Sequence, residues 1–213
     1  MSAEQGLFDL PTPGPSPVVD RAGRGRAGSR FTRRVTAEVT VQRLPVLLDA
    51  AVRAFDGSAA VDLGEIDADD MDIDDEAADS REQIGGDAAA ALGWLLDPTD
   101  GMWPLLEAGS AMVIGADIDT AQLSTARYRL SWTVTIQLRD VAAFRRVASD
   151  ACPDGDAEAR AEIAQSLAAA WQWAAPPFAP LHRIPAITWS PVDAVVAHVP
   201  ARAGRTLVGG DDR

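Results

Sequence analysis

The sequence contains no lysine and no asparagine, and all 19 of its basic residues are arginine. Lysine and asparagine have AT-rich codons, whereas alanine, arginine, glycine and proline have GC-rich ones, so we expect a GC-rich, bacterial genome. Without lysine, no glycine-rich segment can form a phosphate-binding P-loop, because that loop needs its lysine on the β- and γ-phosphates. The sequence also lacks the strand–GxGxxG–helix pattern that binds a dinucleotide.

Cysteine occurs once, at Cys152, so no disulfide bond can form within the chain. This usage suits a reducing compartment, and we expect a cytoplasmic protein. The first residues have no basic start followed by an apolar core, so we expect no signal peptide. Apolar runs stay well short of the roughly 18–20 residues that cross a bilayer, so we expect no contact with a membrane.

Histidine is scarce too, which leaves few candidates for metal or acid–base chemistry. His182 follows a proline-rich turn and His198 lies in an apolar run, and neither has a second metal ligand at a recognised spacing. Cys152 comes just before a proline at an expected helix end, where the helix dipole opposes a thiolate. We therefore predict no catalytic residue, no metal and no cofactor.

Acidic residues outnumber basic ones by 32 to 19, which gives a net charge of −13. A folded surface with this charge disfavours general binding of nucleic acid. The exception is the stretch from Asp20 to Arg34, which holds six arginines. This stretch is either a solubilising leader or an electrostatic contact for nucleic acid or for the chain's own acidic segment.

Proline and glycine are concentrated near the N-terminus, where prolines remove backbone donors and glycines weaken any ordered state. We expect a disordered arm over residues 1–30 and a flexible tail over residues 201–213. The apolar content of the intervening residues 31–200 suits a single domain.

Within the arm, the segment Glu4–Leu10 resembles the short peptides by which bacterial replication and repair proteins dock on the sliding clamp. In one register Gln5 leads, with Phe8 and Leu10 as apolar anchors. In the other register Leu7 and Phe8 form the apolar pair. The resemblance implies a protein partner, bound by an exposed peptide that becomes ordered on binding.

The clearest element is a strand expected over Ser124–Leu138, followed by a helix that Asp140 caps. Apolar side chains occupy the even positions of this strand and polar ones the odd positions, which is the period of a strand with one buried face. Phe31–Gln42 alternates in the same way. Both segments therefore predict amphipathic strands of a sheet that is covered on one side.

The two strands belong to an internal repeat. Val39–Gln42 matches Val134–Gln137 at an offset of 95 residues, and each copy continues into an alanine-rich helix with a tryptophan. We infer two diverged repeats, residues 31–119 and 124–200, joined by a hairpin that turns near Asp119. The remaining expected elements are helices over Val46–Phe55, Asp87–Leu96 and Asp156–Trp173, strand Ser110–Ile118, and closing strands Ala186–Trp189 and Ala194–Val199.

An acidic run, Asp62–Glu82, distinguishes the first copy, with eleven carboxylates against one arginine. Such density repels itself, so we expect a solvated loop, inserted over residues 58–84. Asp70, Asp72 and Asp74 alternate as in a calcium-binding EF-hand loop. However, that loop requires glycine at its sixth position and glutamate at its twelfth. Asp75 and Arg81 stand there, so the motif is incomplete.

The expected element order predicts an α+β fold. Two strand–helix–helix–strand repeats would form an antiparallel sheet with helices on one face, on a ferredoxin-like plan. Core aromatics would pack against this sheet or line a ligand pocket between the repeats. The residues expected at such a pocket are Trp132, His182, Arg183, Trp189 and His198.

Three functions are compatible with these features. The first is a non-catalytic cytoplasmic adaptor that binds other proteins, with a replication or repair clamp as the partner of its N-terminal peptide. The second is a small-molecule-binding or enzymatic domain that uses the pocket. The third is an assembly component of a phage or mobile element.

Overall fold

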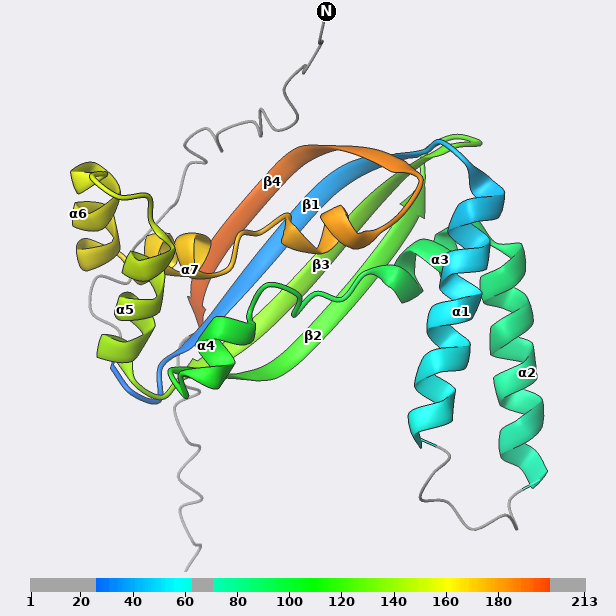
Figure 1. Ribbon diagram of the computed structural model, residues 1–213, viewed down its shortest axis with the longest axis horizontal. Coiled ribbons are helices and arrows are strands. Elements are labelled where there is room, and N and C mark those ends of the chain that lie inside the picture. The colour runs from blue at the N-terminus through cyan, green and yellow to red at the C-terminus, as the bar shows by residue number, and fades with distance from the viewer. Residues whose placement is uncertain (1–25, 63–70, 200–213) are drawn as a thin grey trace, which may run out of the picture.

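The computed structural model describes residues 26–62 and 71–199 (Figure 1). Three predicted features lie outside these residues: the peptide that resembles clamp-docking peptides, most of the arm, and the tail. In chain order the elements are β1 (Arg30–Val41), α1 (Leu44–Asp62), α2 (Met71–Gly86), α3 (Ala88–Leu95), α4 (Trp103–Glu107), β2 (Ala111–Gln122), β3 (Arg127–Leu138), α5 (Val141–Ala151), α6 (Ala157–Gln165), α7 (Leu167–Ala174), the 3₁₀ helix η1 (Ala179–Arg183) and β4 (Ile187–Val199).

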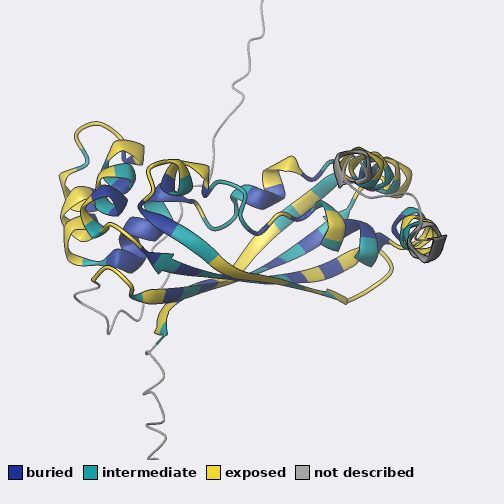
Figure 2. Ribbon diagram, turned by 90° about the horizontal axis from the view of Figure 1, so that it is seen from below, coloured by how far each residue is buried: buried dark blue, intermediate teal, exposed yellow. Residues whose placement is uncertain are grey.

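The fold is α+β, as predicted. Its four strands form one antiparallel sheet in the order β2-β3-β1-β4. Figure 2 shows the sheet edge-on, with the helices gathered on one side of it. None of the described helices lies on the opposite face, where the side chains of the two central strands are partly or fully accessible.

The alternation of side chains decides which face of each strand is covered. In β3 the even residues, from Tyr128 to Leu138, are buried, and the odd residues remain polar and accessible. In β1 the odd residues from Phe31 to Val39 are buried, and Val35 pairs with Trp132 across the two central strands. Because cross-strand partners share a face, the two amphipathic patterns meet in one core.

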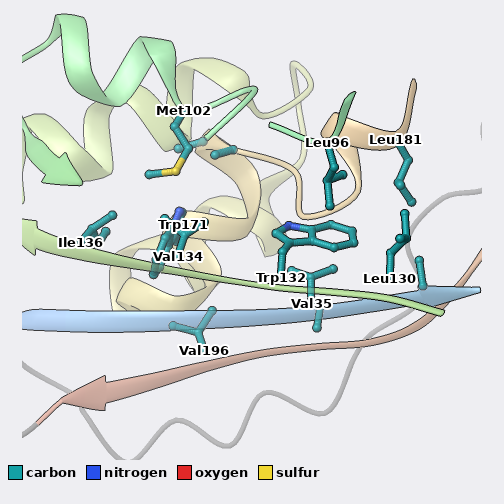
Figure 3. Packing of buried hydrophobic residues seen from close by; sticks show 14 of the residues in the cluster. Val35, Leu96, Met102, Leu130, Trp132, Val134, Ile136, Trp171, Leu181 and Val196 are labelled. Atoms are coloured by element: carbon teal, nitrogen blue, oxygen red, sulfur yellow. The ribbon is translucent and has the colours of Figure 1, made fainter. Parts of the chain in front are cut away.

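The core lies between the sheet and its helices. Its largest fully buried side chains include Trp132 from the central strand β3 and Trp171 from α7. Figure 3 shows both indoles on the helix side of the sheet, close to Met102 and Leu96 from the segment between α3 and α4. Burial of about 25 cal/mol per Å² of apolar surface is the main force that holds this layer to the sheet.

The acidic segment differs from the prediction. Helix α1 does not end at Asp56-Gly57 but continues to Asp62, and α2 occupies much of the expected acidic loop, up to Gly86. Figure 1 shows α1 and α2 side by side as a hairpin beyond one end of the sheet. Two contacts explain the helix: Ile84 of α2 is buried in the core, and Arg81 pairs with Asp56 of α1.

The predicted helix caps are confirmed. Asp87 accepts a hydrogen bond from the Ala89 amide at 2.8 Å, and Asp140 accepts two from the first turn of α5. The expected helix over Asp156–Trp173 is instead two helices, because the chain becomes extended at Ser166, whose side chain caps α7. Within the described residues, no helix combines the length and apolar character needed to cross a membrane.

The edge strands are longer than predicted. β2 runs to Gln122, so the hairpin turn follows Gln122 rather than lying near Asp119. β4 is a single strand through Pro191, which was expected to separate two strands. A bulge at Val192, next to Pro191, shifts the pairing register between β4 and β1 by one residue. A second bulge occurs at Ile114 in β2. Pro191 is tolerated because edge strands leave some amides unpaired.

Candidate functional site

Four aromatic rings form a continuous row from the core to the surface. Trp132 of β3 meets Phe178 edge-on at 6.3 Å between ring centroids, and Phe178 stacks on Trp189 of β4 at 5.5 Å. His182 of η1 then meets Trp189 edge-on at 5.2 Å. Exposure rises along the row, from buried Trp132 through half-buried Phe178 and Trp189 to exposed His182.

The sheet and η1 together position this row. Trp132 pairs with Val35 and Trp189 pairs with Val39, and both valines are buried on the helix-covered face of β1. Two prolines end α7 and lead into η1, which places His182 over the same face. The row is therefore a product of strand register and one proline-marked turn.

An ion pair holds the outer end of the row. Arg183, next to His182, places its Nε 2.9 Å from Oδ2 of Asp100, in the turn between α3 and α4. The Asp100 side chain is only 12% exposed, whereas Arg183 is 78% exposed. The pair ties η1 to that turn and leaves most of the guanidinium open to solvent.

The spacing of the rings limits the chemistry of the row. Centroid distances of 5.2–6.3 Å mean that the aromatic rings touch one another and fill the space between them. A ligand therefore has access to the outer surface of the accessible residues, Phe178, Trp189, His182 and Arg183, rather than to a space between the rings. This surface suits a flat or anionic group rather than a deeply enclosed substrate.

The structure brings four of the five predicted pocket residues together and places the fifth elsewhere. His198 lies nine positions beyond Trp189 along β4, or about 30 Å at 3.3 Å per residue. Its ring packs edge-on against Phe31 at 5.2 Å. Phe178, which joins Trp132 to Trp189, was not among the predicted pocket residues, because a proline-flanked aromatic carries no periodic signal.

A second surface feature is a set of uncovered apolar side chains. Trp103, at the start of α4, is 69% exposed, which is unusual for an indole. Trp94 of α3 is 44% exposed and packs against Phe55 of α1 at 5.1 Å. The other exposed large apolar side chains are Leu44, Ile114, Leu123 and Val192.

The open face of the sheet is polar and carries one defined ion-pair cluster. Arg127 and Arg129 of β3 donate to the two oxygens of Glu38 on β1, at 2.7 and 3.0 Å. The hydrogen bonds from Arg129, and then those from Arg127, lower the pKa of Glu38. Because each charge in this cluster has a partner, the cluster is adequately explained as a clamp between the two central strands.

One core position departs from the apolar rule. Arg33 of β1 is completely buried on the helix-covered face, and burial lowers its pKa to about 9. Its odd number matches the parity of Phe31, Val35 and Val39, so it lies on the same face of β1 as these residues. The expectation that Arg33 belongs to an exposed, arginine-rich stretch is therefore wrong.

The part of the chain that the structure describes gives little support for metal binding or for thiol chemistry. These residues contain no group of three or more potential metal ligands. Cys152 is buried at the end of α5.

Comparison of the chain with protein-family models, with curated proteins and with solved structures finds no match.

Proposed function

We propose that this protein is a non-catalytic, cytoplasmic adaptor that acts through contacts with other proteins. The observation that carries the proposal is the exposure of Trp103 on α4. Covering an indole removes a large apolar area from water, and tryptophan is enriched among the residues that dominate binding energy at interfaces. A side chain of this kind on a surface helix is therefore a favourable anchor for a partner.

The partner that we propose is a replication or repair clamp. The arm supplies Gln5 and the apolar residues Leu7, Phe8 and Leu10, which resemble clamp-docking peptides, and α4 supplies a second contact on the folded domain. Two linked contacts raise overall affinity, because the second binds at a high effective concentration. In this arrangement the arginines of the arm remain available to nucleic acid near the clamp.

Calorimetric titration of the clamp with the full-length protein tests this proposal. We expect Phe8→Ala to weaken binding at least tenfold and Trp103→Ala to weaken it severalfold. Trp94→Ala is the matched control, because this partly exposed tryptophan lies on α3 and should leave the affinity unchanged. Absence of binding by the wild-type protein would reject the clamp, and equal effects of Trp103→Ala and Trp94→Ala would reject α4 as a contact.

A second candidate function is the binding of a small molecule at the outer end of the aromatic row. The contacts of Trp189 with His182 and the exposed guanidinium of Arg183 favour it. Quenching of tryptophan fluorescence by a panel of aromatic carboxylates would test this alternative. Trp189→Phe should abolish the response and Trp94→Phe should retain it; a response unchanged in Trp189→Phe would exclude the site.

For the architecture, we propose two diverged repeats on a ferredoxin-like plan. A protein built from two similar halves could also serve as an assembly component of a phage or mobile element, which is the third function considered above. The strand order supports the plan, as does the pairing of Thr36 with Ser131, residues that are 95 positions apart and therefore equivalent in the two copies. Co-expression of residues 1–122 and 123–213 should give a stable complex if each half is a folding unit. Light scattering of the full chain would then distinguish a monomeric adaptor from an assembling component.

A further inference from the structure

Arg33 is a fully buried arginine that has no acidic partner among the described residues. The structure gives its guanidinium one hydrogen bond, from Nη1 to the carbonyl oxygen of Ala175, the C-cap residue of α7. The centre of the guanidinium also lies 4.9 Å from the centroid of the Trp171 ring. Its strand neighbours are the apolar residues Val134 and Val196.

These contacts compensate only part of the cost of burying a charge. The negative end of the α7 dipole and the face of the Trp171 ring both favour a cation. However, none of the ion pairs among the described residues involves Arg33, and desolvation is what moves its pKa, to about 9. The group is therefore charged at neutral pH in a low-dielectric interior, where an unpaired ion is strongly unfavourable.

The free donors of Arg33 lie together. Nε and Nη2 have no hydrogen-bond partner among the described residues. These two nitrogens share one edge of the planar guanidinium, and their N–H bonds are parallel. Such an edge is the fork that binds two oxygens of a carboxylate or phosphate at once.

Two further unpaired donors lie in the same layer. The indole Nε1 atoms of Trp171 and Trp132 are buried without a partner among the described residues. Arg33 pairs with Val134, so Trp132 occupies a diagonal position on the same face, about 7–8 Å away between Cα atoms. In the view of Figure 3, the indole nitrogen of Trp132 is on the side of its ring that faces Trp171.

We propose that Arg33 forms the centre of an internal site for a small oxyanion, a carboxylate or inorganic phosphate, that its Nε and Nη2 bind as a fork. The indole N–H groups of Trp171 and Trp132 are the additional donors available to its other oxygens. A hydrogen bond to the Ala175 carbonyl needs only one donor and no positive charge. A bound anion, in contrast, accepts hydrogen bonds from the free Nε and Nη2 and neutralises the charge of the guanidinium. Because Arg33 and Ala175 are both fully buried, entry of the anion requires the segment that begins at Ala175 to move away from β1.

The test measures thermal unfolding of the full chain with phosphate, sulfate, acetate or citrate, against chloride at equal ionic strength. We expect at least one oxyanion to raise the Tm of the wild type saturably by about 2–4 °C or more. Arg33→Met, which keeps the volume but removes the fork, should lose this response. Arg34→Met is the matched control, because Arg34 is the next residue of β1 and is exposed on the other face; it should respond like the wild type.

The arms of this experiment also identify the ligand. A response to acetate and citrate alone assigns a carboxylate, and a response to phosphate and sulfate assigns a tetrahedral oxyanion. The proposal is overturned if no oxyanion raises the wild-type Tm above the chloride reference, or if Arg33→Met responds as strongly as the wild type.

A second measurement needs no variant at Arg33 and covers the case in which Arg33→Met does not fold. In a ¹⁵N-labelled wild-type sample, titration with the oxyanion should shift the indole N–H signals of Trp171 and Trp132 saturably. The signals of the exposed Trp103 and Trp94 should stay in place. Shifts confined to the exposed indoles, or no shifts at all, would also overturn the proposal.

Discussion

Arg81 of α2 donates hydrogen bonds to both carboxylate oxygens of Asp56 on α1, from Nε at 2.7 Å and from Nη2 at 3.0 Å. These hydrogen bonds, which Arg81 donates and Asp56 accepts, lower the pKa of Asp56 and raise the pKa of Arg81. This bidentate pair links two helices across 25 residues of sequence, and it uses the single arginine of the acidic run. Among the described residues, it is the ion pair that connects α1 and α2.

Replacing Arg81 with alanine should loosen α2 with little effect on the rest of the fold, because both partners are about half exposed. Hydrogen exchange should become severalfold faster over residues 77–86. The control is Arg53→Ala, which breaks the exposed i,i+4 pair with Asp49 inside α1 and should leave exchange in α2 unchanged. Equal protection of α2 in the wild type and in Arg81→Ala would contradict this role.

The Glu38 cluster should make part of the stability depend on pH. Since hydrogen bonds from Arg129 and Arg127 lower the folded-state pKa of Glu38, its contribution is present above the ordinary pKa of about 4.3 and is lost as pH falls through the folded-state value. The free energy of unfolding of the wild type should therefore fall more steeply below about pH 5 than that of Glu38→Gln. Urea unfolding at a series of pH values measures both slopes, and parallel curves would rule out this linkage.

The tryptophans should differ sharply in their effect on stability. Trp132 is 1% exposed, so Trp132→Ala should lower the free energy of unfolding by about 3–5 kcal/mol. Trp103 is 69% exposed, and Trp103→Ala should change it by no more than about 0.5 kcal/mol. Chemical denaturation provides the measurement; a large loss in Trp103→Ala would mean that α4 depends on this side chain for folding rather than offering it to a partner.

Ala186, just before β4, has a φ of 59°, in the left-handed region that disfavours side chains with a Cβ. Its carbonyl oxygen accepts a hydrogen bond from the Gln42 amide at 2.8 Å, which holds the chain in this conformation. Ala186→Gly should relieve the strain and stabilise the protein by up to about 1 kcal/mol, or about 2–4 °C in Tm. Ala197→Gly, in the regular part of β4, should instead lower Tm; a loss of similar size in both variants would argue against strain at Ala186.

Much of the fold could be predicted from local patterns. The alternation over Phe31–Gln42 and Ser124–Leu138 predicts two central strands and the face that each one buries. Asp87 and Asp140 precede helical segments, and the structure has both as N-caps. These features depend on side-chain parity and on local hydrogen bonds, which a short segment contains in full.

The wrong predictions concern segments whose conformation depends on contacts with residues far away in the sequence. Charge density alone predicts a loop over the acidic run, but the buried Ile84 and the pairing of Arg81 with Asp56 make α2 a helix. Proline alone predicts a break in β4, but twelve residue pairings with β1, on either side of a bulge, carry the strand through Pro191. Local propensity is a weak term, and long-range packing outweighs it at both places.

The residues of the candidate site also divide into those that the sequence indicated and those that only the fold placed. His182 and Trp189 were selected from their neighbourhood in the sequence, and the fold brings them into contact. Phe178 becomes part of the row only because η1 folds over the sheet, and His198 is too far along β4 to join it.

The sequence by itself determined which side chains of each strand face the core, because the period of a strand is two residues. Arg33 has the parity of the buried residues of β1, but the sequence interpretation placed it among the arginines of the Asp20–Arg34 stretch. Only the tertiary structure decided what surrounds Arg33: Trp171 and Ala175 come from α7, about 140 residues further along the chain, and no carboxylate among the described residues comes with them. Burial follows from local pattern, whereas the partners of a buried charge depend on how distant elements pack.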